Sequence, residues 1–173
     1  MLQLSPKFKE FILTETKRDF LEGTTAAGKT TVGIFKFMLM VAKSDIKYHV
    51  IAGADLGTVE KNVINNERGL LDQFDGLAEY YPKGQGKIGL SHIKYQTPNG
   101  EKIIYVCGYD NKARWKKVLG SQQGCVYIDE VNTADMEFLR EISHRCKYMM
   151  TTSNPDSPDL PVYKEFINHS RPL

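Results

Sequence analysis

This sequence of 173 residues has few cysteines, no long apolar run and little net charge. Cys107, Cys125 and Cys146 are odd in number, widely spaced and without a CxxC pair, which argues against a disulfide framework and a zinc cluster. We expect all three to be buried as small hydrophobic residues. The longest apolar run, residues 37–42, is far shorter than the ~18 residues that cross a bilayer, so no membrane association is expected.

The N-terminus and the charge balance limit the location and the partners. Residues 1–17 alternate charged and apolar side chains without a signal-peptide core, which indicates an intracellular protein. The 23 lysines and arginines barely exceed the 21 aspartates and glutamates, so any nucleic-acid-binding surface has to be local. The 41% hydrophobic content and the 14 glycines are typical of a soluble globular chain, and the length predicts a single domain, residues 1–173.

The N-terminal half alternates helical and strand patterns. Helical spacing covers residues 5–17, a short strand is predicted at 19–22, and a glycine-rich loop leads into a helix that begins at Lys29. A second strand is predicted at 47–53 and a second helix at 55–66. This order predicts an α/β fold with a mostly parallel central sheet flanked by helices.

The C-terminal half is predicted to contain a hairpin and two buried strands. Alternating residues on either side of Thr97-Pro98-Asn99-Gly100 predict a β-hairpin inserted in the sheet, after a glycine- and proline-rich segment at 80–89. Short buried strands are expected at 125–128 and 148–152, and Thr133 is the expected cap of a helix between them.

The glycine-rich loop fits the P-loop pattern GxxxxGK[ST]. Its glycines let backbone N–H groups surround phosphate oxygens, and the helix N-terminus that follows favours negative charge. Lys29 is expected to contact the β- and γ-phosphates, and Thr30 to place its hydroxyl on Mg²⁺. The alternative is an ordinary glycine turn between a strand and a helix. The predicted nucleotide-binding residues are Gly23, Thr24, Thr25, Ala26, Ala27, Gly28, Lys29, Thr30 and Thr31.

Two acidic residues, Asp129 and Glu130, directly follow the predicted strand at 125–128, as in a Walker B motif. Ligands bind at the carboxyl ends of strands in open parallel sheets. Asp129 is therefore expected to hold Mg²⁺, and Glu130 to orient the water that attacks the γ-phosphate. Such a pair indicates hydrolysis of ATP. The alternative is a helix N-terminus whose acidic residues suit the helix dipole.

The predicted strand at 148–152 runs into a third group of polar residues, Thr151-Thr152-Ser153-Asn154-Pro155. Hydroxyl and amide groups at a strand end are suited to sensing a γ-phosphate or its attacking water. Ordinary turn chemistry is the alternative, because these residue types are common where strands end.

At these three places the chain resembles the large subunit of phage terminases, the ATPase that packages DNA into a preformed capsid. The resemblance covers nearly the whole chain and includes EGTTAAGKTT, TPNGEKIIYVCG, KVLGSQQGCVYIDEVNTAD and TTSNPDSPDLPVYKEF. It implies an additional-strand, catalytic-glutamate P-loop ATPase domain in which Thr152, Ser153 and Asn154 couple hydrolysis to movement. It also implies ATP and Mg²⁺ as cofactors. The implied partners are double-stranded DNA, a portal protein and a small terminase subunit, with a homo-oligomeric ring at the procapsid in the host cytoplasm.

The sequence departs from this family in two respects. Many terminases have an arginine inside the P-loop, but residues 24–27 contain none. We expect an arginine finger from a neighbouring subunit to supply the charge, with Arg114 as the first choice. The alternative is that its basic stretch, 112–117, is a solvated surface or contacts DNA phosphates. The family also continues into a nuclease domain for which this chain has no room, so no nuclease activity is expected from these residues.

Other residues add little to the prediction. The resemblance places adenine near the N-terminal segment, where Gln3 or Phe8 are candidates to contact it. The four histidines share no ligand spacing, so no metal besides Mg²⁺ is expected, and His49 is expected to be buried in its strand. The sequence thus predicts an ATPase that powers translocation of double-stranded viral DNA into a procapsid. The alternatives are a helicase- or recombinase-like P-loop ATPase and a nucleotide-gated binding module without turnover.

Overall fold

A single seven-stranded sheet organises the structure, a computed structural model that describes residues 4–23, 28–120 and 122–173. The strand order is β1-β7-β6-β2-β5-β4-β3, and the first five of these strands run parallel while β4 and β3 extend the sheet antiparallel. The predicted α/β fold with a mostly parallel sheet is therefore confirmed. The strands are β1 (Arg18–Glu22), β2 (Tyr48–Gly53), β3 (Ala78–Tyr81), β4 (His92–Thr97), β5 (Gly100–Gly108), β6 (Gln123–Ile128) and β7 (Cys146–Ser153).

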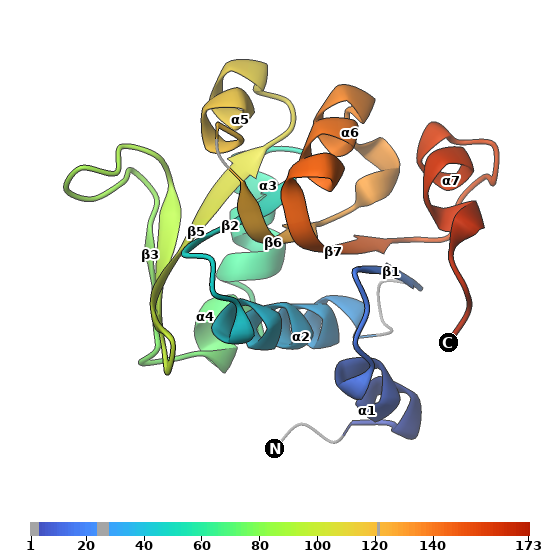
Figure 1. Cartoon of the computed structure of the whole chain (residues 1–173), viewed down its shortest axis with the longest axis horizontal. Helices are drawn as coiled ribbons and strands as arrows, with labels where there is room; N and C mark the ends of the chain where they lie inside the picture. The colour runs from blue at the N-terminus through green and yellow to red at the C-terminus, as the bar shows by residue number, and fades with distance from the viewer. Residues whose placement is uncertain (1–3, 24–27, 121) are drawn as a thin grey trace.

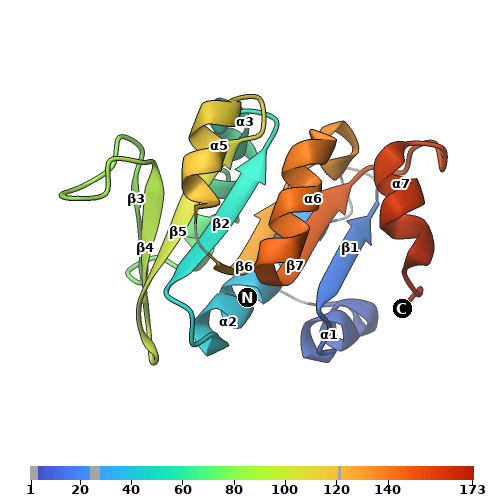
Figure 2. The same cartoon turned by 45° about the horizontal axis from the view of Figure 1, so that its top comes forward.

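Helices cover both faces of the sheet (Figures 1 and 2). On one face α2 lies with α1 and α4, and on the other face lie α5 and α6. None of the described helices is both long and apolar enough to cross a membrane. The helices are α1 (Pro6–Leu13), α2 (Lys29–Lys43), α3 (Leu56–Val59), η2 (Glu60–Ile64), α4 (Leu70–Gln73), α5 (Lys112–Val118), η3 (Val131–Thr133), α6 (Met136–Arg145), α7 (Pro161–Glu165) and η4 (Ile167–His169).

The central strands are buried on both faces, which is usual for parallel strands covered by helices. In β6, Cys125 and Tyr127 pack into the core beneath α2, whereas Val126 and Ile128 pack into the core beneath α5 and α6. This alternation follows from the two-residue period of a strand. Asp129 continues the alternation after Cys125 and Tyr127. Its side chain is therefore expected on the same face of the sheet as α2.

The predicted hairpin is confirmed, with Thr97 paired to Gly100 across a two-residue turn. Gly100 has φ +92°, a conformation that glycine adopts without strain. The glycine- and proline-rich segment at 80–89 begins within a strand, because Tyr80 and Tyr81 belong to β3 and pair with β4. A four-residue edge strand shows too little alternation to be recognised alone.

The structure tests the predictions for His49, Thr133 and Cys146. His49 is buried as expected: its Nε2 lies 2.8 Å from the Ile46 carbonyl, its Nδ1 accepts from the Cys125 N–H at 2.8 Å, and burial lowers its pKa to about 4. Thr133 does not cap α6, because Asp135 accepts from the Phe138 N–H at 3.0 Å. Cys146 is only half-buried, because it begins β7 at the margin of the sheet, whereas Cys107 and Cys125 are buried.

Candidate functional site

Three of the parallel strands, β1, β7 and β6, end at the same edge of the sheet, and their arrows point the same way in Figure 2. β1 precedes the P-loop and β6 precedes the acid pair, with β7 between them. This intervening strand is the arrangement expected of the additional-strand class. The expected nucleotide-binding residues 24–27 lie outside the described residues. Gly28 has φ +70°, so the chain enters α2 through a left-handed conformation that favours glycine.

Lys29 begins α2, and its side chain is buried, with 6% of the residue exposed. Its Nζ donates to the Gly23 carbonyl oxygen at 2.7 Å and to Asn154 Oδ1 at 2.8 Å. Within the described chain no carboxylate forms an ion pair with it. A buried ammonium that contacts only neutral oxygens is poorly compensated, so the geometry suits an anionic ligand.

Asp129 follows β6 directly and is 4% exposed. Its Oδ1 accepts from Thr152 Oγ1 at 2.9 Å. Burial raises the pKa of this carboxyl, and the charge of Glu130 adds to the rise, while hydrogen bonding by Thr152 and Asn62 and the charge of Lys29 oppose it. Because the described chain offers no cation close enough for an ion pair, Asp129 is a buried oxygen donor suited to a divalent cation.

Glu130 is half-buried and has φ +52°, a left-handed conformation that is unusual for a residue other than glycine. The same Thr152 Oγ1 that donates to Asp129 accepts from the Glu130 N–H at 3.4 Å. The Glu130 carbonyl accepts from Tyr109 Oη and from Thr133 Oγ1, each at 3.2 Å. These bonds hold a backbone conformation that turns the glutamate away from the strand direction.

The segment that follows β7 is joined to both of its neighbours. The Gly23 N–H donates to the Ser153 carbonyl at 3.2 Å, and Asn132 Nδ2 donates to the Asn154 carbonyl at 2.8 Å. Together with the contact between Lys29 and Asn154, these bonds connect the P-loop, the acid pair and the end of β7. The structure thus brings together Lys29, the acid pair and residues 152–154, as the sequence prediction requires.

Arg114 is not part of this group. It lies on α5, is half-buried, and its charge acts on Tyr80 and Cys107, whereas Lys29 is the cation that shifts the pKa of Asp129. Lys112 forms an ion pair with Glu137 on α6 at 2.8 Å.

Sequence reasoning missed Tyr109, Asn132 and Asn62. Tyr109 directly follows β5, so the rule that ligands bind beyond the carboxyl ends of parallel strands was the signal that could have found it. Asn132 lies two residues after the acid pair, and Asn62 lies in the π-helix η2, a form often found at functional sites. Neither asparagine belongs to a recognisable sequence pattern.

A cleft of about 970 Å³ adjoins Lys29, between α1, β1 and the last residues of the chain. Phe8, a candidate for adenine contact, lines it, whereas Gln3 lies outside the described residues. Its aromatic and charged walls suit a flat base joined to an anion. The lining residues are Lys7, Phe8, Phe11, Thr14, Thr16, Arg18, Asp19, Phe20, Leu21, Glu22, Lys29, Glu165, Phe166, Ile167, His169, Ser170, Arg171, Pro172 and Leu173.

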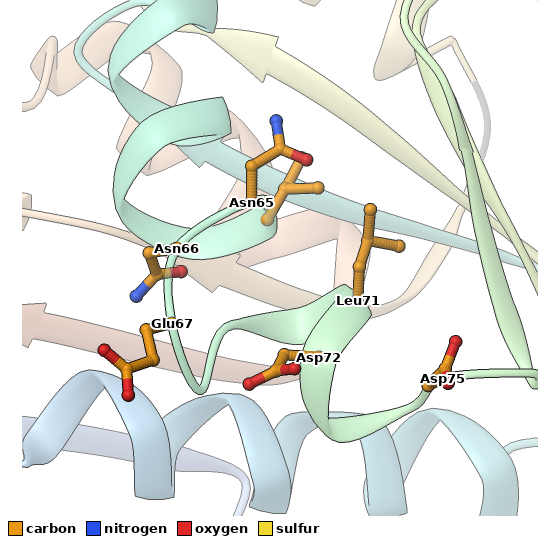
Figure 3. Close-up of a pocket in the computed structure, with 7 residues that line it drawn as sticks. Asn65, Asn66, Glu67, Leu71, Asp72 and Asp75 are labelled. Atoms are coloured by element: carbon orange, nitrogen blue, oxygen red, sulfur yellow. The ribbon is translucent and has the colours of Figure 1, made fainter.

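A second pocket of about 480 Å³ lies between the end of η2 and α4 (Figure 3). Three carboxylates line it, and none of its lining residues is basic, which disfavours a phosphate ligand. The lining residues are Ile64, Asn65, Asn66, Glu67, Leu71, Asp72 and Asp75.

Comparison with known families finds no family model that matches this chain, and comparison with curated proteins finds no match either. Solved structures do match. The large terminase of a thermophilic bacteriophage, in crystal form 2, is similar with a TM-score of 0.81 and 16% sequence identity, over 96% of this chain and 43% of that one.

Two complexes of the same phage terminase are also similar. The complex with ATP-γ-S gives a TM-score of 0.77 at 16% identity, over 96% of this chain and 42% of that one. The complex with ADP gives a TM-score of 0.74 at 18% identity, over 95% of this chain and 42% of that one. The chain therefore has a fold found in a large terminase, spans less than half the length of that protein, and its resemblance to terminases is confirmed at the level of the fold.

Proposed function

We propose that this chain is the ATPase domain of a terminase large subunit, which hydrolyses ATP to move double-stranded DNA into a viral procapsid. One observation carries the proposal: Lys29 and Asn154, 125 residues apart in the chain, meet with Lys29 Nζ 2.8 Å from Asn154 Oδ1, at the sheet edge that also holds the acid pair. The shared fold with a terminase that binds ATP-γ-S and ADP supports it.

The triphosphate binds along residues 23–31, at the N-terminus of α2. Lys29 moves from the oxygens of Gly23 and Asn154 to the β- and γ-phosphates, which compensate its buried charge better than neutral groups do. The adenine lies in the cleft beside Phe8. The ATP-γ-S and ADP complexes of the similar terminase support nucleotide binding.

Thr30 and Asp129 hold Mg²⁺ in this proposal. The fit rests on their donor oxygens and on the raised pKa of Asp129, a buried carboxyl that a cation would stabilise in its charged form. When bound, Mg²⁺ neutralises charge that develops on the β- and γ-phosphate oxygens. Thr152 keeps the Asp129 carboxylate oriented through its 2.9 Å hydrogen bond.

Glu130 orients the attacking water and accepts its proton. Its backbone is fixed by Thr152, Tyr109 and Thr133, so the point from which its side chain extends is set before the nucleotide arrives. Residues Thr152, Ser153 and Asn154 couple hydrolysis to movement, because Asn154 loses its contact with Lys29 whenever the lysine binds phosphate. Release of the phosphate restores that contact.

The assembled motor contains several copies of the chain in a ring at the procapsid in the host cytoplasm, with a portal protein and a small terminase subunit as partners. Arg114 acts as an arginine finger on a neighbouring copy. No nuclease activity resides in these residues. The isolated domain is a slow ATPase, because the arginine is supplied only by assembly.

The decisive experiment is Glu130→Gln, assayed for phosphate release and for ADP and ATP affinity. We expect kcat to fall at least ~100-fold while affinity stays within about twofold, because the amide keeps the volume but cannot accept the proton. Glu67→Gln, an exposed change at the acidic pocket, is the matched control and should leave both quantities unchanged.

Two results would contradict the proposal. Full activity in Glu130→Gln would remove the assigned role of the glutamate. A wild-type chain that binds ATP but never turns it over, even with DNA present and the ring assembled, would favour the nucleotide-gated binding module.

A further inference from the structure

Tyr127 is the buried residue of β6 that lies two positions before Asp129. It is 0% exposed, and its ring meets that of Phe37 on α2 edge to face, with 5.8 Å between centroids. Gly33 permits this approach: a Cβ there would lie 3.3 Å from Tyr127 Cε2 and 3.7 Å from its hydroxyl. The hydroxyl therefore lies against α2, one turn beyond Lys29 and Thr30.

This hydroxyl forms no hydrogen bond with any group in the described part of the chain. Burying an unpaired hydroxyl is unfavourable, and phenylalanine would fill the same space without that penalty. The surrounding side chains belong to the apolar core beneath α2. The unpaired hydroxyl destabilises the nucleotide-free protein. Its presence is readily explained if it gains a hydrogen-bond partner when a ligand binds.

Thr30 and Thr152 present the nearest candidate partners. Thr30 lies one turn before Gly33 on α2, and the hydroxyl groups of Thr30 and Thr152 both oppose the rise in the pKa of Tyr127, which burial causes and the charge of Asp129 increases. Neither hydroxyl meets Tyr127 with hydrogen-bond geometry here. Thr152 already donates to Asp129 and accepts from Glu130, which leaves its oxygen one lone pair, whereas no described group is seen to donate to Thr30 Oγ1.

We propose that Tyr127 is a positioning residue that donates a hydrogen bond from its buried hydroxyl to Thr30 Oγ1 when nucleotide and Mg²⁺ are bound. The inference rests on the proposed function, in which Thr30 is a ligand of the ion. A threonine oxygen has two lone pairs, so one can accept from Tyr127 while the other faces the cation. Groups that orient metal ligands in this way typically change metal affinity 10- to 100-fold when they are removed.

The test is Tyr127→Phe in the full chain, with fluorescently labelled ADP titrated at increasing Mg²⁺ and again in EDTA. We expect the Mg²⁺ concentration that gives half-maximal binding to rise at least ~10-fold. Affinity in EDTA should stay the same, and the thermal midpoint without nucleotide should not fall, because no hydrogen bond of the free protein is removed.

Two further variants separate positioning from packing. Tyr148→Phe is the matched control, because its buried hydroxyl donates to Asp19 at 2.6 Å instead: it should lower stability and leave the Mg²⁺ midpoint unchanged. Gly33→Ala keeps the Tyr127 hydroxyl but places a Cβ 3.1 Å from Leu21 Cδ1 and 3.3 Å from the Tyr127 ring, so both neighbours have to shift and the Mg²⁺ midpoint should rise.

An unchanged Mg²⁺ midpoint in Tyr127→Phe would overturn the inference while leaving the proposed function intact. If the wild-type chain binds labelled ADP with no dependence on Mg²⁺, the proposed function fails, and the role of Tyr127 fails with it.

Discussion

Asp129 shows, at the scale of one residue, how a site can oppose the stability of its own fold. Burial raises the pKa of its carboxyl above the value in the unfolded chain. A group of this kind binds its proton more tightly in the folded state, so folding becomes more favourable as the pH falls through the folded pKa and less favourable as the pH rises. At neutral pH the charged form therefore opposes folding.

We predict that Asp129→Asn stabilises the nucleotide-free protein and abolishes the Mg²⁺-dependent part of nucleotide affinity. The amide oxygen can still accept from Thr152, so the buried charge is removed while that hydrogen bond is kept. A gain of about 1 kcal/mol would raise Tm by about 2–4 °C in a chain of this size. Thermal unfolding followed by circular dichroism at pH 7 measures this, and the gain should shrink as the pH is lowered.

The control is Asp75→Asn, an exposed change at the acidic pocket, for which Tm should not move. A lower Tm for Asp129→Asn would mean that the charged carboxylate is paired better than the contacts indicate, and the assignment of a divalent cation there would lose its support.

At the scale of elements, the sequence was most informative where a helix or strand is long and its burial is regular. α2 has apolar residues at helical spacing, and β2, β6 and β7 each contain a short apolar run that is buried, so each was predicted close to its observed bounds. The strand order depends on pairing between distant segments, as when β7 pairs with both β1 and β6. The sequence patterns therefore did not predict that order.

Short elements were missed for a physical reason. β3 and α4 have four residues each and α7 has five, too few to show a period, and packing against their neighbours stabilises them. The stretch 112–117 stands out in the sequence for its charge. In the structure it forms α5, which ends at Val118 and buries Trp115 and Val118. The candidate site was predictable as residues at strand ends, but the contact between Lys29 and Asn154 and the unpaired Tyr127 hydroxyl were not, because they depend on three-dimensional approach.

β1 is an edge strand, and a buried ion pair connects it to α2. Lys36 Nζ lies 2.7 Å from Asp19 Oδ2, and their side chains are 2% and 10% exposed. Tyr148 Oη and Thr16 Oγ1 also donate to Asp19, and Lys36 donates to the Thr14 carbonyl. The strand that leads into the P-loop thus depends on this pair for its position.

We predict that Asp19→Ala lowers the free energy of unfolding by about 3–5 kcal/mol, because it leaves the Lys36 ammonium buried without its counter-ion. Urea unfolding at pH 7 measures the change. The double variant Asp19→Leu with Lys36→Met removes both charges and should recover a large part of the loss. A loss below about 1 kcal/mol in the single variant would show that water or another group compensates Lys36.

At the scale of the whole molecule, the net charge of +2 gives no general attraction for DNA, so local charge has to matter. Glu137 on α6 pairs with Lys112 at 2.8 Å and lies 3.9 Å from Lys116. Arg114 and Lys117 form no ion pair with the residues that the structure describes. Residues 24–27 of the P-loop contain no arginine. The P-loop thus lacks a positive charge that α5 carries elsewhere on the same chain. If copies of the chain stand side by side in a ring, α5 of one copy can supply that charge to the P-loop of its neighbour.

This complementarity predicts recovery of activity on mixing two inactive variants. Arg114→Ala keeps an intact acid pair, and Glu130→Gln keeps the arginine, so each ring made of one variant should be inactive. In a mixed ring, Arg114 of a Glu130→Gln copy reaches the intact site of an Arg114→Ala neighbour, and random mixing should restore about a quarter of the wild-type ATPase rate. Recovery requires an arginine that acts between copies, because no single chain in the mixture holds both groups. Inactivity of the mixture, with rings shown to exchange subunits, would assign Arg114 to the basic surface that contacts DNA phosphates.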